Sequence, residues 1–318
     1  MRVAFLGNAP WSVPALEALS GSSHRVGLVA TRVPRPAGRG NRLEPTPVAE
    51  AARRLRVPLE EVETVKSGPG FEALAKAAPD VMVVVAYGEI LPKALLDLPS
   101  AAPINLHFSL LPALRGAAPV QRAIMEGHKV TGVTTIRMDE GLDTGPILLQ
   151  AEEAISPDDD AGSLGARLAE LGGRLLVETL DRLEAGALAE QPQDDDAATY
   201  APKLKPEDRV IDWTQPAEAI VRQVRALAPD PAARATFRGK TLKIFRASSS
   251  NEDTAARPLA DQQDSLSPGR VFNDIDRGLQ VVTGQGFLKL EEVAPEGRRR
   301  MTAAEFERGY RPDGEILG

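Results

Sequence analysis

Val81-Met82-Val83-Val84-Val85 is an uninterrupted run of apolar side chains. A strand with one face in water alternates apolar and polar residues, whereas a strand covered on both faces is apolar throughout. The run therefore predicts a central strand of a parallel sheet with helices on both faces. Before it, residues 2–6 and 25–31 are further strand candidates, and residues 10–19 carry apolar side chains at helical spacing. Strands that alternate with helices predict an α/β fold built from βαβ units.

The pattern continues after this run. Residues 103–106, 131–138 and 146–149 are strand candidates, and residues 118–126 have the spacing of a helix. We expect a doubly wound, mostly parallel, Rossmann-like sheet. Ligands of such sheets bind beyond the carboxyl ends of the strands, so the loops after residues 6, 85, 106 and 138 are the places to look for a site.

The chain of 318 residues is about twice the length of a typical domain of roughly 150 residues, which favours two domains. Leucines at spacings of three and four predict a long amphipathic helix over residues 162–185. The polar, Pro- and Asp-rich stretch that follows has no apolar period. Short strand candidates then lie at residues 210–213, 241–247, 269–272, 278–283 and 286–293, with one helix at 217–227. We therefore predict a first domain over residues 1–185, a linker over 186–205, and a small β-barrel-like (OB-like) domain over 206–318.

Composition excludes several kinds of chemistry. The chain contains no cysteine, which rules out disulfides, thiolate metal sites and a thiol nucleophile. GxGxxG, GxxxxGK[ST] and HExxH motifs are also absent, so nicotinamide, nucleotide triphosphate and zinc chemistry lose support. No apolar run approaches the roughly 20 residues that cross a bilayer, and no signal peptide is evident. We expect a soluble, cytoplasmic protein that needs no metal.

One strand end combines two polar side chains suited to catalysis. Asn105 and His107 are two residues apart at the end of the predicted strand 103–106, so their side chains point to the same face. A carboxamide beside an imidazole forms a pair of hydrogen-bond donors that suits a developing oxyanion. A carboxylate is the expected third member, and the turn-rich loop after the strand 131–138 offers Asp139, Glu140 and Asp143. The local sequence leaves the choice among the three open.

Several motifs in a fixed order carry a resemblance to a known family. They are Asn105-Leu106-His107-Phe108-Ser109-Leu110-Leu111-Pro112, Arg115-Gly116-Ala117-Ala118-Pro119, Thr131-Gly132-Val133-Thr134, and Gly141-Leu142-Asp143-Thr144-Gly145. The chain resembles the 10-formyltetrahydrofolate-dependent formyltransferases over essentially its whole length. Two further segments favour the members of this family that act on methionyl-tRNA: Arg35-Pro36-Ala37-Gly38-Arg39-Gly40 followed by Pro45-Thr46-Pro47-Val48, and Ala86-Tyr87-Gly88-Glu89-Ile90-Leu91-Pro92. Ile211-Asp212-Trp213 resembles the start of the family's carboxyl-terminal domain. Phe108 departs from the small residue or proline usual at that position.

The resemblance implies a reaction and assigns residues to it. The amine of methionine, esterified to tRNA, attacks the formyl carbon of 10-formyltetrahydrofolate. Asn105 and a protonated His107 are the implied donors to the resulting oxyanion, and Asp143 is the residue that holds the imidazolium. The folate is expected to contact two loops beyond strand ends, at residues Ala86, Tyr87, Gly88, Ile90, Leu91, Ser109, Leu110, Leu111 and Pro112.

The same resemblance implies that initiator methionyl-tRNA is the partner. The net charge of −7 is unevenly distributed, because basic side chains outnumber acidic ones between residues 203 and 246. The predicted tRNA contacts are Arg35, Arg39, Arg42, Lys203, Lys205 and Arg209. We expect a monomer. The alternative is a sugar-nucleotide N-formyltransferase with the same folate donor, which would have no use for the Arg-rich segment 32–42.

Overall fold

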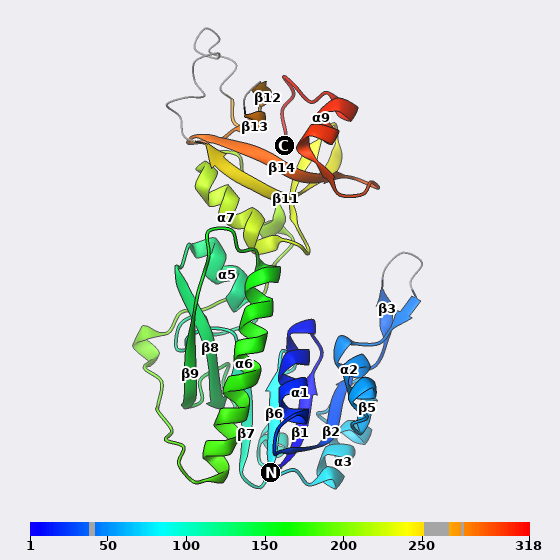
Figure 1. Cartoon of the computed structure of the whole chain (residues 1–318), viewed down its shortest axis with the longest axis vertical. Coiled ribbons are helices and arrows are strands. Elements are labelled where there is room, and N and C mark those ends of the chain that lie inside the picture. Colours follow the sequence, from blue (N-terminus) through cyan, green and yellow to red (C-terminus); the bar gives the residue numbers. More distant parts are fainter. Residues whose placement is uncertain (38–41, 251–266, 275–276) are drawn as a thin grey trace. The chain divides into compact units, whose positions relative to one another are not determined.

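The computed structural model describes residues 1–37, 42–250, 267–274 and 277–318 (Figure 1). Its contacts divide the chain into two compact units. Unit 1 comprises Met1–Pro119, Val130–Ala154 and Gly165–Pro202, and unit 2 comprises Val120–Lys129, Ile155–Leu164 and Lys203–Gly318. None of the helices in these described ranges combines the length and the apolar character needed to cross a membrane.

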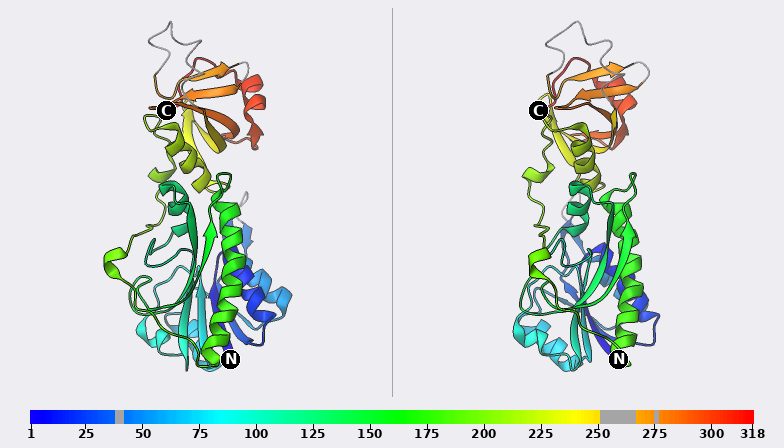
Figure 2. Two further views of the ribbon diagram at one scale, coloured as in Figure 1. Left: turned by 60° about the vertical axis from the view of Figure 1, so that its left-hand side comes forward. Right: turned by 90° about the vertical axis from the view of Figure 1, so that its left-hand side faces the viewer.

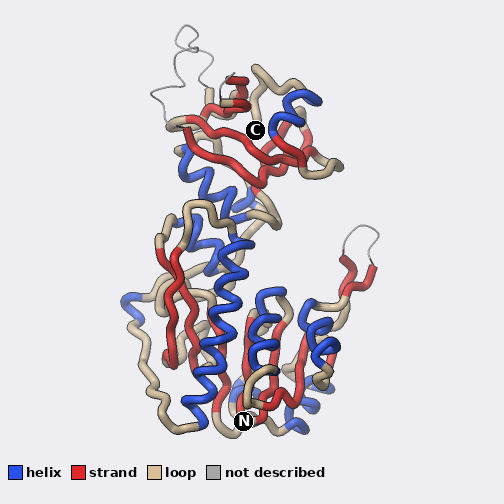
Figure 3. Tube along the Cα trace, in the orientation of Figure 1, coloured by secondary structure: helices blue, strands red, loops and turns tan. Residues whose placement is uncertain are grey.

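Unit 1 is built on a seven-stranded sheet in the order β5-β2-β1-β6-β7-β8-β9. The strands from β5 to β7 run parallel to one another, and β8 and β9 are antiparallel to their neighbours. Helices and strands alternate along this part of the chain, as Figure 3 shows. The mostly parallel sheet predicted from the sequence is confirmed. The strands are β1 (Arg2–Gly7), β2 (Arg25–Arg32), β5 (Leu59–Val62), β6 (Val81–Val85), β7 (Ala102–His107), β8 (Val130–Arg137) and β9 (Ile147–Ala154).

The helices of the first part of the chain connect these strands. They are α1 (Val13–Ser20), α2 (Pro47–Leu55), α3 (Gly68–Ala77), α4 (Lys93–Leu96), α5 (Pro119–Glu126) and α6 (Ala161–Glu184), with the 3-10 helix η1 (Pro10–Ser12) before α1. Thr46 begins α2, because its hydroxyl accepts a hydrogen bond from the backbone NH of Ala49. Pro119 opens α5, where the missing NH of proline costs nothing. A separate two-stranded sheet pairs β3 (Arg35–Ala37) with β4 (Arg42–Glu44).

Strand β6 is the centre of the unit 1 sheet. All five of its side chains are buried, as the unbroken apolar run requires for a strand covered on both faces. Helix α6 packs on the same sheet, and Figure 2 shows its long course. A Cβ at Gly172 of this helix would lie 2.7 Å from the Leu106 side chain, so glycine permits the close approach of α6 to β7.

Unit 2 contains an antiparallel sheet in the order β10-β11-β14-β13-β12, with β15 paired to β14. Helices α7 (Ala217–Leu227) and α9 (Ala303–Tyr310) contact it. The strands are β10 (Ala233–Phe237), β11 (Lys240–Ser250), β12 (Val271–Asp274), β13 (Gly278–Val282), β14 (Phe287–Pro295) and β15 (Met301–Thr302). Buried side chains of this sheet and both helices form a separate apolar core. The predicted second domain of short antiparallel strands is confirmed.

Two segments differ from the expectation. Residues 210–213 do not form a strand, since only Val210 makes a bridge, to Arg234. Ile211 and Trp213 supply buried side chains to the unit 2 core, while the Asp212 carboxylate accepts from the Thr214 backbone and closes a turn. The segment 186–205, expected to be a linker, is hydrogen-bonded to unit 1 over much of its length, for example at the backbone pair of Ile147 with Gln191.

Candidate active site

Three predicted residues come together at the carboxyl edge of the unit 1 sheet. Asn105 and His107 lie on the last residues of β7, and Asp143 lies in the loop between β8 and β9. The Asn105 Nδ2 donates to Asp143 Oδ1 at 3.2 Å. The other carboxylate oxygen, Oδ2, lies 3.6 Å from His107 Nδ1 and accepts from the Gly116 backbone NH at 2.9 Å. The carboxylate therefore joins the carboxamide and the imidazole.

Each nitrogen of the His107 ring faces an oxygen atom. Its Nε2 lies 2.9 Å from the backbone oxygen of Leu114, and its Nδ1 faces the Asp143 carboxylate. Both partners are acceptors, and only the imidazolium form carries a hydrogen on each ring nitrogen. The side chain is only 6% exposed, so solvent offers little competition for these contacts. The Asp143 carboxylate thus places a negative charge directly beside the buried ring.

The loop of Asp143 has an unusual backbone. Asp143 adopts φ +56°, in the left-handed region that few residues other than glycine occupy. A Cβ at Gly145 would lie 1.8 Å from the carbonyl oxygen of Arg137, so this position excludes any side chain. Asp139 accepts from the Gly141 NH and the Thr144 hydroxyl, and so shapes the loop. Of the loop carboxylates that the sequence left open, it is Asp143 that contacts the histidine.

The first loop predicted to bind folate follows β6. Ala86 and Gly88 have positive φ values of 45° and 81°, which turn the chain beyond the strand end. Leu91 and Tyr87 are buried, whereas Ile90 is 70% exposed. Burial, assisted by the nearby charge of Glu89, raises the pKa of Tyr87 to about 12, so its hydroxyl keeps its hydrogen.

The second predicted folate loop follows β7 and is fixed by a threonine. The Thr134 hydroxyl donates to the Ser109 backbone oxygen at 2.7 Å and accepts from the Leu111 NH at 3.1 Å. Leu110 is half-buried beside Gly132, where a Cβ would lie 2.5 Å from the leucine side chain, and Pro112 is also half-buried. The Thr134 hydroxyl thus fixes the backbone of this turn, and Gly132 leaves room for Leu110.

Phe108 has a structural explanation. Its side chain is 6% exposed and lies against Trp11, with ring centroids 5.9 Å apart. The aromatic ring therefore contributes to packing between β7 and the start of the first helix.

Sequence reasoning missed several groups around Asp143. The Gly116 NH and the Gln193 amide donate to Asp143, the latter to its backbone oxygen at 2.8 Å. The backbone oxygen of Leu114 contacts His107, and the Arg115 side chain contacts Gln193. Backbone groups leave no mark in a sequence. Gln193 lies in a polar, Asp-rich stretch that no motif distinguishes.

The predicted tRNA contacts lie in both units. Arg35 is exposed on β3, Arg42 begins β4, and Arg39 lies outside the described residues. Residues 35–37 and 42–44 pair as antiparallel strands, with Arg35 opposite Glu44. Lys203 and Lys205 are exposed at the start of unit 2.

Arg209, the third predicted tRNA contact in unit 2, differs from the two lysines. Arg209 is half-buried, and its Nε has no hydrogen-bond partner within the described part of the chain. The Arg209 guanidinium is therefore only partly exposed to solvent.

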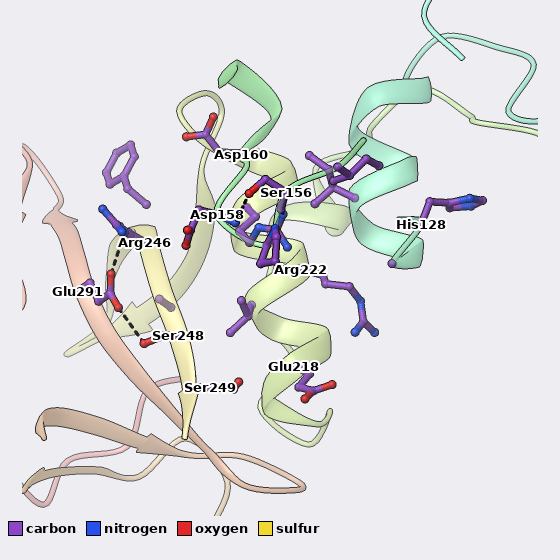
Figure 4. A pocket seen from close by; sticks show the side chains of 18 of the residues that line it. His128, Ser156, Asp158, Asp160, Glu218, Arg222, Arg246, Ser248, Ser249 and Glu291 are labelled. Atoms are coloured by element: carbon purple, nitrogen blue, oxygen red, sulfur yellow. Dashed lines mark hydrogen bonds and ion pairs between the residues drawn. The ribbon is translucent and has the colours of Figure 1, made fainter. Parts of the chain in front are cut away.

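Unit 2 also contains a cavity of about 790 Å³, which Figure 4 shows. Its charged groups are largely paired. Arg246 contacts Glu291 at 2.8 Å, and the same carboxylate accepts from Ser248. Arg222 donates to a backbone oxygen of α5, and Arg225 donates to two backbone oxygens near the start of α6. Cationic and anionic residues both line the cavity, so it shows no preference for a ligand of one charge. Across the described residues, no cluster of three His, Asp or Glu side chains could hold a metal ion.

Comparisons with known proteins agree with this arrangement. A family model described as formyl transferase matches residues 1–180, and a model described as formyl transferase, C-terminal domain, matches residues 203–311. The curated methionyl-tRNA formyltransferase of Heliobacterium modesticaldum is 45% identical over 312 residues, which are 98% of this chain and 98% of that protein.

Solved structures show the same fold. The methionyl-tRNA formyltransferase from Clostridium thermocellum has a TM-score of 0.56 at 18% identity, covering 80% of this chain and 95% of that chain. HypX from Aquifex aeolicus, in complex with tetrahydrofolic acid, has a TM-score of 0.62 at 18% identity, covering 96% of this chain and 47% of that chain. The family models and the curated relative together show that this chain belongs to the formyl transferase family, with the proteins named methionyl-tRNA formyltransferase.

Proposed function

We propose that this enzyme transfers the formyl group of 10-formyltetrahydrofolate to the α-amino group of initiator methionyl-tRNA. The product is N-formylmethionyl-tRNA, which serves in translation initiation. The observation that carries the proposal is the cluster of Asn105, His107 and Asp143 at the sheet edge. It occurs in a chain whose curated relatives, 42 to 45% identical over nearly all of its length, are named methionyl-tRNA formyltransferase.

The cluster provides the groups that formyl transfer needs. The neutral amine attacks the formyl carbon, a new C–N bond forms, and the carbonyl oxygen becomes an oxyanion. One amide hydrogen of Asn105 is used by Asp143, and the second is available to the oxyanion. Both ring nitrogens of His107 face other acceptors, so its proposed contribution is the positive charge of an imidazolium beside the oxyanion and not the hydrogen bond that the resemblance implied. The amine proton passes through water to Asp143 and from there to the folate nitrogen. The oxyanion then collapses to the carbonyl of the new formamide as the bond from the formyl carbon to that nitrogen breaks.

The folate is proposed to lie against the loops that follow β6 and β7. Both loops are at the carboxyl edge, as is usual for ligands of doubly wound sheets. Two large apolar side chains on loops of this edge are exposed, Ile90 at 70% and Leu142 at 53%. Apolar side chains exposed beside polar groups are typical of a site for an aromatic ligand such as a pterin. No step requires a metal.

The tRNA is proposed to contact Arg35, Arg39 and Arg42 near its acceptor end, where guanidinium groups pair with phosphates and stack on unpaired bases. Lys203, Lys205 and Arg209 are proposed as a second group of phosphate contacts. The same proposal includes a cytoplasmic location, because translation in the cytoplasm uses charged initiator tRNA. It also includes a monomeric enzyme.

The test is a formylation assay that compares acceptors. Purified enzyme and 10-formyltetrahydrofolate are mixed with initiator methionyl-tRNA, elongator methionyl-tRNA or a sugar-nucleotide amine. The expected result is the highest kcat/KM on initiator methionyl-tRNA, with kcat reduced about 10²–10³-fold in Asn105→Ala and His107→Ala. Faster formylation of the sugar-nucleotide amine, or near-normal turnover by His107→Ala, would overturn the proposal.

A further inference from the structure

Gln193 connects the segment after α6 to the loop of Asp143. Its Nε2 donates to two backbone oxygens of that loop, to Asp143 at 2.8 Å and to Gly145 at 2.7 Å. Its Oε1 accepts from Arg115, from Nε at 3.1 Å and from Nη2 at 2.9 Å. The Gln193 amide therefore links the buried Arg115 guanidinium to two backbone oxygens of the Asp143 loop.

The hydrogen-bond partners dictate the orientation of this amide. A guanidinium has only donors, so the side of Gln193 that faces Arg115 must be oxygen. The two loop carbonyls are only acceptors, so the opposite side must be NH₂. No flipped amide and no carboxylate satisfies both sets of partners. The position therefore requires glutamine, and glutamate of nearly the same shape would oppose two carbonyl oxygens.

Arg115 is itself held in place. It is 2% exposed, and its Nη2 also contacts Asp195 Oδ1 at 2.8 Å. Its backbone NH donates to the Thr199 oxygen, and its oxygen accepts from the Ala201 NH. A buried guanidinium has to be fully paired, because burying an unpaired charge is costly. The segment 191–201 supplies these partners, so it fixes the arginine that in turn orients Gln193.

We propose that Arg115 and Gln193 form a positioning pair that holds Asp143 in its left-handed conformation, and through it Asn105 and His107. The φ of +56° is an unfavourable conformation that persists only when surrounding contacts enforce it. The pair does so from the backbone side, while the carboxylate faces the other two residues. This inference rests on the proposed function for the roles of those three side chains. Gln193 and Arg115 act through Asp143 and not on the substrate.

The first experiment compares Gln193→Glu with Gln191→Glu. Gln191 lies two residues earlier in the same segment with an exposed side chain, so this variant adds the same charge without opposing the loop. Gln193→Glu is expected to lower kcat about 10- to 100-fold, since small displacements of catalytic groups have large effects, with the KM for both substrates within about threefold. Gln191→Glu should retain wild-type kcat. Equal activity of the two variants would overturn the proposal.

A double-mutant cycle separates positioning from general destabilisation. If Gln193 acts through Asp143, then adding Gln193→Glu to Asp143→Asn should lower kcat by no more than about threefold. Losses that multiply would show that Gln193 acts independently of Asp143, and would refute the positioning role. If Gln193→Glu does not fold, the same cycle is run with Gln193→Ala, which removes the bridge without adding a charge.

The last readout does not depend on turnover. The chain has three histidines, so the ring signal of His107 can be assigned in an NMR spectrum with a His107→Ala variant. Gln193→Glu should move the His107 ring signal and leave those of His24 and His128 unchanged. An unmoved His107 signal would refute the inference even in an active enzyme. If the wild type formylates no acceptor while the signal moves, the proposed function fails and the positioning geometry stands.

Discussion

Replacing Asp143 by Asn removes one charge from the site and preserves its shape. Asparagine tolerates the left-handed backbone about as well as aspartate, so the loop should keep its conformation. The amide can still accept from the Gly116 NH, and Asn105 can reverse its own amide to match the new NH₂ group. What the variant cannot supply is a negative charge beside the His107 ring.

The size of the effect follows from the distance between the two charged groups. His107 Nδ1 and Asp143 Oδ2 are 3.6 Å apart. Two unit charges at that distance attract each other by about 4–5 kcal/mol at an effective dielectric constant of about 20. This energy corresponds to about three orders of magnitude in rate if all of it were lost in the transition state. Because the amide keeps part of the hydrogen bonding, we expect kcat to fall about 10²–10³-fold.

Single-turnover formylation of methionyl-tRNA provides the assay. Asp143→Asn should lower the rate, with unfolding transitions like those of the wild type. Glu140→Gln is the matched control, because it removes one carboxylate charge from an exposed side chain of the same loop. If Asp143→Asn kept more than a tenth of the wild-type rate, the coupling to His107 would be refuted.

Three further outcomes are expected. Gly145→Ala should lower the free energy of unfolding in urea by at least about 2 kcal/mol, because the added Cβ would meet a backbone oxygen of β8 at 1.8 Å; unchanged stability would contradict this loop geometry. The double variant Lys203→Ala, Lys205→Ala should make tRNA binding less dependent on salt. The slope of log K against log salt concentration should become shallower by up to about 0.9 per lost phosphate contact, and an identical slope would argue against phosphate contacts. Burial opposes the charge of Asp208, but the Lys205 backbone NH and the Arg122 guanidinium outweigh it and hold the pKa of Asp208 below its usual range. A lowered carboxyl pKa stabilises the fold above the unfolded pKa of about 4, and this stability is lost as pH falls through the folded pKa. Between pH 6 and pH 3 the Tm of the wild type should therefore fall more than that of Asp208→Asn, and equal declines would contradict the pKa shift.

The elements of unit 1 were predictable where a period persists along the chain. The apolar run of β6 and the leucine spacing of α6 indicate which faces of these elements are buried. A buried face requires apolar side chains, which therefore recur with the period of the strand or helix. The pattern failed at residues 210–213, where apolar side chains enter a core without a strand. Burial alone dictates apolar character there, and hydrogen bonding to a neighbour decides whether a strand forms.

The sequence by itself determined the alternation of strands and helices, the α/β class, and the two polar side chains at the end of β7. Their spacing of two residues is a local property, and every strand shows it. Only the tertiary structure decided which carboxylate meets His107 and what holds that carboxylate in place. Gln193 contacts Asp143 across 50 residues of chain, and Arg115 reaches Gln193 across 78. Such contacts join residues that are far apart in the sequence, so they depend on the folding of the whole domain. Periodicity reports only local structure and does not predict them.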